Sequence, residues 1–253
     1  MIHLKSDLEI QRIRASCRIA AQTMVEVARI VRPGVTTRAL DEVAEAYIRG
    51  QGAVPSAKGY RGYPASICVS VNDEVVHGIP GDRRLREGDI LAVDIAVKKD
   101  GYHGDMNVTM GAGALSRQAQ HLLETTREAM EIGLRACQSG QRLGDVGHQI
   151  QTFVEGRGYA IVRDYCGHGI GRTFHEDPQV LHFGVPGSGR RLQPGMVFTV
   201  EPMVNQGVAE VRLLDDQWTA VTADGGLSAQ FEHTVAVTRN GPLVLSRFDD
   251  LPF

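Results

Sequence analysis

The spacing of apolar residues at the start of the chain predicts a long helix. Ser6 and Glu9 form a capping box, a pattern in which two side chains satisfy the free backbone N–H groups of a helix N-terminus. Apolar residues then recur at helical spacing, at Leu8, Ile13, Cys17, Ala20, Met24, Ala28 and Val31. The sequence Arg32-Pro33-Gly34 ends this pattern, because proline cannot donate a helical hydrogen bond.

A second amphipathic helix follows, and its pattern recurs later in the chain. Its apolar face holds Leu40, Val43, Ala44, Tyr47 and Ile48, and Gly50 and Gly52 end it. The stretch VRPGVTTRALDEVAEAYIRGQG from residue 31 resembles CQSGQRLGDVGHQIQTFVEGRG from residue 137. At this offset of 106, matching positions include the pairs Gly34–Gly140, Leu40–Val146 and Tyr47–Phe153.

The repeat continues into two apolar strands, and each contains one acid. EGDILAVDIAV from residue 87 resembles QPGMVFTVEPMV from residue 193, which aligns Asp94 with Glu201. An unpaired charge inside an apolar strand costs several kcal/mol unless it is neutralised. One such acid is as easily explained by a buried pair with an arginine. Two acids at matching points of a repeat favour a shared function instead.

The duplicated pattern of two helices followed by strands predicts an α/β (α+β) protein. We expect a single catalytic domain over residues 1–253, because no linker rich in Pro, Gly or Ser divides it. Its two pseudo-repeat halves are expected at about 5–113 and 114–245. A pseudo-twofold between these halves brings Asp94 and Glu201 to one central cavity.

Composition narrows the function classes. The 253 residues are 42% apolar, which is enough for a full core, and the formal net charge of -3 gives no bulk attraction to nucleic acid or anionic membranes. The exposed-looking arginines Arg83, Arg84 and Arg86 are interpreted as a solvated surface. The four cysteines contain no C-x-x-C pair, and neither a signal peptide nor an apolar run of 18 residues is present. We therefore expect a cytoplasmic protein without a membrane segment.

The stretch YCGHGIGRTFHEDP, residues 165–178, contains two histidines seven positions apart. It is not the helical H-E-x-x-H zinc motif, because position 179 is Gln and the glycines disfavour a helix. The glycines indicate a backbone that passes close to a packed site. His168 is interpreted as a metal ligand and His175 as a hydrogen-bond donor to substrate. Glu176 and Asp177 are expected to cap the turn that follows.

Two further acids complete a set of hard ligands. Asp105 follows Asp94 by eleven residues, and Glu232 precedes an apolar strand. Four carboxylates and one imidazole suit Mn, Fe, Co or Zn rather than a thiolate site. Two divalent cations balance the four negative charges, and a pair of metals about 3.5–4 Å apart activates water for hydrolysis.

These residues resemble the methionine aminopeptidases, in their short bacterial type I form. The resemblance runs from about Leu4 to Val244 and rests on NDEVVHGIP, DGYHGD, YCGHGIGRTFHEDPQVLH, LQPGMVFTVEPMV and LSAQFEHT, which occur in this order. Only 33 residues separate His168 from Glu201, which leaves no room for the insertion of the type II enzymes. The family implies the pita-bread fold, an antiparallel sheet flanked by helices with an internal pseudo-twofold.

The resemblance also implies roles for individual residues. Asp94 would chelate one of two divalent ions (Co, Mn, Fe or Zn), Asp105 and Glu232 would bridge both, and His168 and Glu201 would complete the other. Glu201 would also shuttle the proton of the attacking water, and His77 and His175 would contact substrate. The methionine pocket is expected to contain Tyr60, Tyr63, Cys68, Phe174 and Trp218, with Trp218 partly exposed at its rim. The glycines beside His168 are expected to give the substrate backbone room.

The expected partners follow from the same resemblance. The substrates would be nascent polypeptide N-termini with a small residue after the initiator methionine, and the enzyme would associate transiently with the ribosome. We expect a monomer, and a monovalent cation near Asn72 and Ser228. Some positions depart from the family pattern: Ala57, Arg61, Ala96, Met106 and Asn107.

Two alternatives remain at this point. A proline-directed aminopeptidase of the same fold shares the five ligands, although such enzymes usually carry an additional amino-terminal domain and lack the HGIP sequence. A pita-bread protein that binds a partner without catalysis is the other, but those proteins lose metal ligands, whereas all five positions are kept here.

Overall fold

A large antiparallel sheet forms the centre of the protein. The computed structural model describes residues 2–253. The strand order along the sheet is β1-β4-β5-β13-β9-β7-β8. Their bounds are β1 Val54–Pro55, β4 Asp89–Lys99, β5 Tyr102–Ala112, β13 Ser228–Thr238, β9 Val197–Val200, β7 Gly167–Gly169 and β8 Glu176–Val180.

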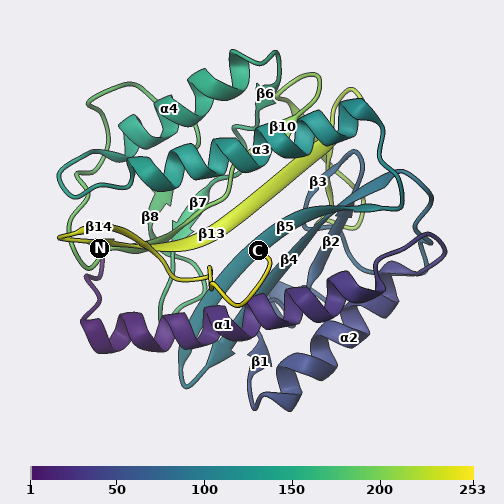
Figure 1. The fold of residues 1–253 in the computed structure, drawn as a ribbon, viewed down its shortest axis with the longest axis horizontal. Coiled ribbons are helices and arrows are strands. Elements are labelled where there is room, and N and C mark those ends of the chain that lie inside the picture. Colours follow the sequence, from purple (N-terminus) through teal and green to yellow (C-terminus); the bar gives the residue numbers. More distant parts are fainter. Residues whose placement is uncertain (1) are drawn as a thin grey trace.

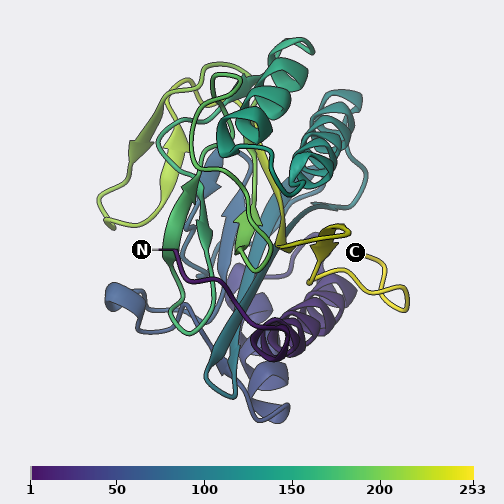
Figure 2. The same ribbon diagram turned by 90° about the vertical axis from the view of Figure 1, so that its left-hand side faces the viewer.

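Short strands extend this sheet, and a second sheet lies beside it. On the main sheet β2 pairs with β4, β14 with β13, and β10 with both β13 and β6. The smaller sheet has the order β11-β12-β3, and in the side view β11 and β12 stand away from the helices (Figure 2). The bounds are β2 Cys68–Val71, β3 Glu74–Val76, β6 Ala160–Ile161, β10 Met203–Asn205, β11 Val211–Leu213, β12 Ala220–Thr222 and β14 Gly241–Val244.

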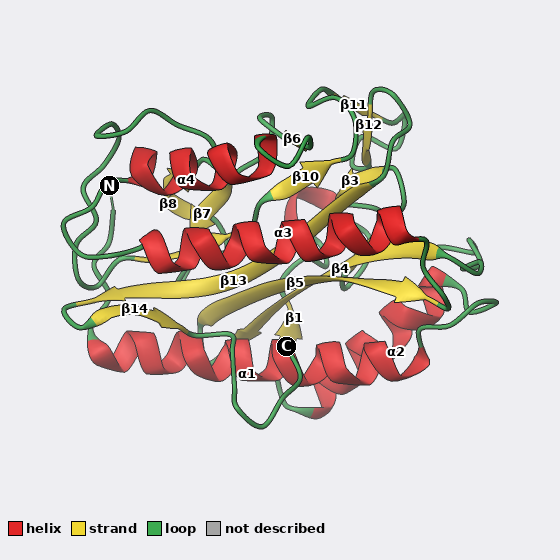
Figure 3. Cartoon of the chain, turned by 45° about the horizontal axis from the view of Figure 1, so that its top comes forward, coloured by secondary structure: helices red, strands yellow, loops and turns green. Residues whose placement is uncertain are grey.

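The four α-helices in the described part of the chain pack on the sheet. They are α1 Asp7–Ile30, α2 Thr37–Gly50, α3 Arg117–Ala136 and α4 Leu143–Glu155. The pair α1 and α2 lies along the β4–β5 half, and the pair α3 and α4 lies along the β13 half (Figure 1). Figure 3 shows α1 and α3 crossing the same face of the sheet. None of the helices described between residues 2 and 253 is long and apolar enough to cross a membrane.

The predicted ends of the first two helices are confirmed. Ser6 accepts a hydrogen bond from the Glu9 backbone N–H, and the Glu9 side chain accepts one from the Ser6 backbone, so the capping box is complete. The first helix ends at Ile30, before Arg32-Pro33-Gly34, and the second ends at Gly50. Local capping chemistry therefore sets these boundaries, as the sequence indicated.

Strand alternation separates the helix-facing core from the polar face of the sheet. Val93 and Ile95 are fully buried in the core cluster that also contains Met24 of α1. Asp94 lies between Val93 and Ile95 in the sequence. Because successive side chains of a strand point to opposite faces, Asp94 projects to the face opposite the core. The same alternation on β5 separates Met106, in the core, from Asp105 and Asn107.

The register of the sheet places the predicted acids at neighbouring positions on adjacent strands. Asn107 pairs with Asp94 on β4 and with Glu232 on β13. Asp105 lies two residues away on the same face of β5, opposite Ala96. The strands β4 and β9 flank the central β5–β13 pair, an arrangement that agrees with the predicted duplication; the assignment of one domain with two halves stays a prediction.

Candidate active site

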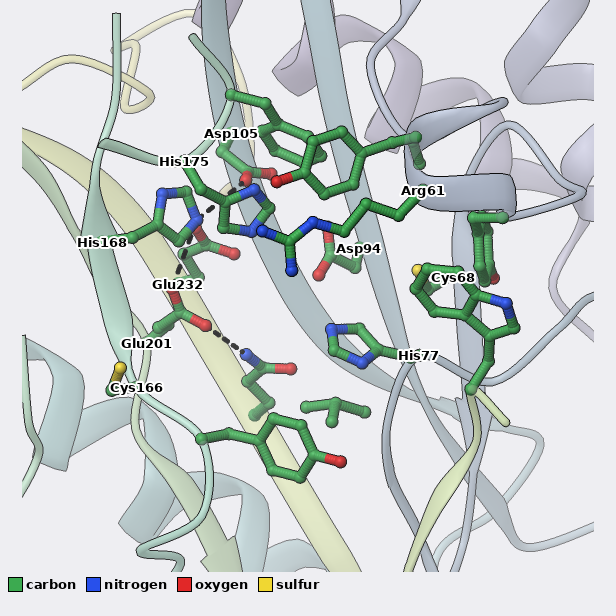
Figure 4. Close-up of a pocket in the computed structure, with 18 of the residues that line it drawn as sticks. Arg61, Cys68, His77, Asp94, Asp105, Cys166, His168, His175, Glu201 and Glu232 are labelled. Atoms are coloured by element: carbon green, nitrogen blue, oxygen red, sulfur yellow. Dashed lines mark hydrogen bonds and ion pairs between the residues drawn. The ribbon is translucent and has the colours of Figure 1, made fainter. Parts of the chain in front are cut away.

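A cavity of about 310 Å³ opens on the polar face of the sheet. It is lined by every residue that the sequence predicted to bind metal or substrate: Tyr60, Tyr63, Cys68, His77, Asp94, Asp105, His168, Phe174, His175, Glu201, Trp218 and Glu232. Asn72 and Ser228, the predicted neighbours of a monovalent cation, lie outside its lining. The cavity thus collects residues from β2, β4, β5, β7 and β13 and from the segments after β3 and β9 (Figure 4).

The predicted metal ligands converge at one end of the cavity. His168 Nε2 lies 3.8 Å from Asp105 Oδ2 and 3.8 Å from Glu201 Oε1. One potential ligand atom from each of Asp105, His168 and Glu232 lies within 4.8 Å of the others. Asp94 and Glu201 are outside this tightest group but line the same cavity. The two aspartates interact directly, which perturbs the pKa of both carboxyls.

Burial and mutual repulsion make these carboxyls hard to ionise without a cation. Burial raises the pKa of Asp94 to about 6 and that of Glu201 to about 8. Burial, together with the charges of neighbouring acids, raises the pKa of Asp105 and of Glu232 well above the ordinary range. Divalent cations among these oxygens reverse this penalty.

The residues present fit divalent ions. Asp105 Oδ1 and Glu232 Oε1 are buried and have no hydrogen-bond partner within residues 2–253. A buried carboxylate oxygen without a partner is costly, so its retention requires an explanation. Oxygen ligands with one imidazole nitrogen match the preference of Mn, Fe, Co and Zn. Asp105, His168 and Glu232 offer the most compact set for such an ion.

Glu201 is held by three neighbouring groups. The Thr199 hydroxyl donates to Oε1 at 2.6 Å, and the Gln230 amide donates to Oε2 at 3.1 Å. The backbone N–H of Glu201 donates to His182 Nε2 at 3.0 Å. Burial lowers the pKa of His182 to about 3, so its ring stays neutral and can accept this bond. These contacts fix the carboxylate in one orientation.

The two histidines of the glycine-rich segment lie next to each other in the cavity but make different contacts. His168 lies on β7, beside the acids, and its Nδ1 lies 3.0 Å from the Gly169 carbonyl oxygen, which leaves Nε2 toward the acids. His175 lies just before β8, with its ring stacked on Tyr60 at 5.0 Å between centroids. Burial lowers the pKa of His168 to about 4 and of His175 to about 3, so both rings are neutral at pH 7.

The glycines beside His168 serve packing of the protein on itself, which corrects the expectation that they make room for substrate. A Cβ at Gly167 would lie 2.4 Å from the Thr199 carbonyl oxygen, and a Cβ at Gly169 would lie 2.1 Å from the Asp177 carbonyl oxygen. Neither neighbour is a flexible side-chain end. The glycines therefore let β7 approach β9 and β8 closely, and this approach places His168.

The expectation that Glu176 caps the following turn is also wrong. Its side chain reaches back instead: Oε1 accepts from the Thr173 backbone N–H at 3.0 Å, and Oε2 accepts from Lys5 Nζ at 2.5 Å. The Lys5 side chain is only 2% exposed. A partly buried ion pair thus joins the N-terminal segment to the loop that carries Phe174 and His175.

The other end of the cavity is apolar and aromatic. Tyr63 is buried and donates its hydroxyl hydrogen bond to the Gly78 carbonyl at 2.9 Å. Its ring meets Trp218 edge to face at 5.1 Å, and Trp218 is half-buried, as expected for the rim. Cys68 is buried in the same small cluster. His77 meets Trp218 and Tyr165 edge to face, between this apolar end and the acids.

Several residues of the site were not singled out from the sequence. Thr199 and Gln230 each lie two positions before a predicted ligand, on the same face of the strand, and this period of two could have identified them. Asn107 was noted only as a departure, but its amide donates to Gln230 Oε1 at 2.9 Å. His182 carried no local signal, because it acts through the backbone of a residue 19 positions away.

Comparison with known proteins agrees with this geometry. The model of Metallopeptidase family M24 matches residues 11–239. Methionine aminopeptidase 1 of Bacillus subtilis is 49% identical over 247 residues, with 98% of this chain and 100% of that protein covered. The methionine aminopeptidase of Escherichia coli K12 is 45% identical over 252 residues, with 98% and 96% covered.

Solved structures of methionine aminopeptidases are also similar to this chain, and proline-directed enzymes of the same fold are less similar. The methionine aminopeptidase from Rickettsia prowazekii superposes with a TM-score of 0.96 at 40% identity, covering 98% of this chain and 100% of that one. The Xaa-Pro dipeptidase from Bacillus anthracis has a TM-score of 0.78 at 23% identity and shares the fold alone, with only 62% of its chain covered. The pita-bread fold is therefore confirmed. The chain belongs to metallopeptidase family M24 and, within it, to the methionine aminopeptidases.

Proposed function

We propose that the protein removes the initiator methionine from the N-terminus of nascent polypeptides when the second residue is small. The observation that carries this proposal is one cavity with five metal-type ligands at one end, all buried or half-buried, and an aromatic, apolar subsite at the other. Its volume of about 310 Å³ lies near the lower limit of about 300 Å³ for ligand pockets. A small cavity favours one unbranched side chain and a small neighbour.

As a metallopeptidase, the protein uses a divalent metal. We propose two ions (Co, Mn, Fe or Zn), with Asp94 on one, His168 and Glu201 on the other, and Asp105 and Glu232 shared by both. When bound, such ions lower the pKa of water and polarise the scissile carbonyl. The retained positions of all five residues argue against a scaffold that has lost catalysis.

Glu201 is the proposed proton carrier. Its carboxylate is oriented by Thr199 and Gln230, so one oxygen faces the cavity in a fixed position. A positioned base and acid of this kind contributes about 10²–10⁴ in rate. It would take the proton from the attacking water and deliver it to the leaving amine.

His175 and His77 are the proposed substrate contacts. Both rings are neutral at pH 7, because burial lowers the pKa of His77 to about 4 and that of His175 to about 3. A neutral imidazole can donate one hydrogen bond to a carbonyl oxygen without adding a charge beside the cations. We assign this role to His175, next to the acids, and place His77 beside the peptide that follows.

The methionine subsite consists of Tyr63, Cys68 and Trp218, with Tyr60 and Phe174 at its boundary with the acids. Tyr60 and Phe174 meet edge to face at 5.2 Å, and Phe174 also contacts the His168 ring. A flexible, polarizable thioether packs well against such aromatic edges. Asn72 and Ser228 are proposed to hold a monovalent cation; the buried Ser228 hydroxyl, which has no hydrogen-bond partner among the described residues, supports this.

The setting of the reaction is also a proposal. A substrate that is a nascent chain implies transient association with the ribosome and a cytoplasmic location. We propose that the protein acts as a monomer, because the complete ligand set lies on one chain.

Peptide hydrolysis by the metal-loaded protein tests the proposal. Methionine should be released from Met-Ala-Ser and Met-Gly peptides far faster than from Met-Lys or Met-Trp peptides, and an Xaa-Pro peptide should remain intact. Treatment with a chelator should abolish release, and added Co or Mn should restore it. Equal rates on small and large second residues, faster hydrolysis of the Xaa-Pro peptide, or full turnover without metal would each reject the proposal.

A further inference from the structure

The mouth of the cavity carries one arginine for which the proposed reaction has no use. Arg61 belongs to the 3-10 turn η1 (Tyr60–Gly62) and lines the cavity. Its side chain reaches inward between His175, Asp94 and His77 (Figure 4). Within residues 2–253 its guanidinium makes no hydrogen bond or ion pair and only lies 5.4 Å from the centre of the Tyr60 ring.

The backbone of this turn places the Arg61 Cα at the edge of the cavity in an unusual conformation. Arg61 has φ of 49°, in the left-handed region that residues other than glycine rarely adopt. Gly59 and Gly62, which also have positive φ, flank it, and the Tyr63 N–H closes the turn onto the Tyr60 carbonyl at 2.9 Å. Residues held in such sparsely populated conformations cluster at binding sites.

The turn is also braced against the reacting end of the cavity. The Tyr60 ring stacks on His175 with an interplanar angle of 22° and meets Phe174 edge to face. Arg61 is therefore attached to a packed residue, although its own side chain is exposed. The backbone that carries the Arg61 cation is thus held in place by the Tyr60 contacts, while the guanidinium itself stays available to a ligand group at the mouth.

Charge balance leaves Arg61 free to bind an anion from the substrate. The two divalent ions proposed above would balance the four carboxylates of the cavity and leave the guanidinium charge available. No carboxylate of the described chain lies within ion-pair distance of it, although seven other arginines reach one within 3.5 Å.

We propose that Arg61 recognises a carboxylate on the peptide downstream of the scissile bond, an acidic side chain at the third residue of the substrate. This inference rests on the proposed aminopeptidase function and adds a specificity to it. The second residue is restricted to small side chains, so the third is the first position that can carry an acidic group. A guanidinium binds a carboxylate through two parallel hydrogen bonds, which gives it directional selectivity.

Three amidated peptides that differ only at the third residue test this assignment: Met-Ala-Glu-, Met-Ala-Gln- and Met-Ala-Lys-, each followed by the same neutral residues. Amidation removes the terminal carboxylate, which would otherwise offer a second anion. We expect kcat/KM for the Glu peptide to exceed that for the Lys peptide about fivefold at low salt, and the ratio to shrink at 0.5 M salt.

Variants identify the residue responsible. In Arg61→Gln the ratio of kcat/KM for the Glu peptide to kcat/KM for the Lys peptide should fall to about one. In Arg61→Glu the Lys peptide should become the better substrate. Arg157→Gln is the matched control, because it makes the same charge change at an exposed arginine after α4 and should leave the ratio unchanged. Thermal unfolding of each variant shows that the fold is intact.

Each outcome has a defined meaning. A ratio near one in the unmodified protein, or an unchanged ratio in Arg61→Gln, overturns the assignment. An equal loss on all three peptides also overturns it, and would make Arg61 a lid of the methionine subsite. Failure to release methionine from any peptide, including the Gln one, refutes the aminopeptidase function itself and is thereby distinguished from failure of the Arg61 assignment.

Discussion

Removing the metal should make the stability of the protein fall as the pH rises above 7. The carboxyls of Asp105 and Glu232 have a pKa well above the ordinary range, and that of Glu201 is raised to about 8. Each group therefore binds more protons in the folded protein than in the unfolded one. Its contribution to stability is full below the unfolded pKa and is lost as the pH rises through the folded pKa.

The histidines whose pKa is lowered act in the opposite direction and set the useful pH range. Six have a pKa lowered by burial to about 3 or 4: His77, His103, His168, His175, His182 and His233. A lowered histidine pKa gives stability that is present above the unfolded value of about 6.5 and is lost below it. The two effects oppose each other below pH 7. Between pH 7 and 8 each unfolded histidine releases only about a fifth of a proton, which offsets roughly 1 kcal/mol at most for all six, so the carboxyls dominate.

The size of the effect follows from proton linkage. One carboxyl that stays protonated only in the folded state costs up to about 1.4 kcal/mol per pH unit. Three such groups give an upper limit of about 4 kcal/mol, and we take roughly half, about 2 kcal/mol, because water enters a metal-free site. For a chain of this size, 1 kcal/mol corresponds to about 2–4 °C. The melting temperature of the metal-free protein should therefore fall by about 4–8 °C from pH 7 to pH 8.

Thermal unfolding with and without chelator measures this change. The metal-loaded protein should lose less stability over the same range, because bound cations favour the ionised carboxylates. Glu232→Gln, which removes one titrating group, should reduce the pH dependence of the metal-free protein. A metal-free melting temperature that is constant or increases from pH 7 to 8 would refute the reasoning.

Three further outcomes are expected. Glu201→Gln should lose most turnover in a steady-state assay at saturating metal, since the substitution removes a charged ligand and the proposed base. His168→Ala should lower metal content and activity together, whereas His175→Ala should lower activity only, as elemental analysis and kinetics on the same samples would show. Lys5→Met should cost about 1–3 kcal/mol of unfolding free energy in denaturant titration, because it removes the cation that pairs with the half-buried Glu176, and the double variant with Glu176→Gln should recover much of it.

Much of this site was predictable because its residues follow simple periods. Asp94 and Glu201 interrupt apolar strands at matching points of a repeat, and the period of two places both on the polar face. The helix ends were predictable for a different reason: Ser6, Glu9 and Pro33 act on their immediate neighbours in the sequence. A slip of one residue in strand pairing would move the apolar side chains out of the core, so burial on one side of the sheet specifies the register. The correct register in turn brings the ligands together.

The contacts that were missed join residues far apart in the chain. Lys5 and Glu176 are 171 positions apart, and each looks like an ordinary surface residue in its own segment. The function assigned to the glycines was wrong because their neighbours, Thr199 and Asp177, come from other strands. The backbone conformation of Arg61 has a positive φ that no sequence pattern specified. Periodicity predicts which face a side chain takes, but it does not predict which distant backbone lies against that face.

The two histidines that first drew attention to the site show how the roles can be separated. Their rings are only 4.1 Å apart between centroids, so proximity alone does not tell a ligand from a hydrogen-bond donor. His168 Nε2 faces Asp105 and Glu201, whereas His175 stacks on Tyr60. His175→Ala should therefore keep the metal content and lower kcat about 10²–10³-fold, as loss of one oxyanion donor does, with little change in KM. Loss of metal from His175→Ala, or two tightly bound ions in His168→Ala, would mean that the roles are reversed.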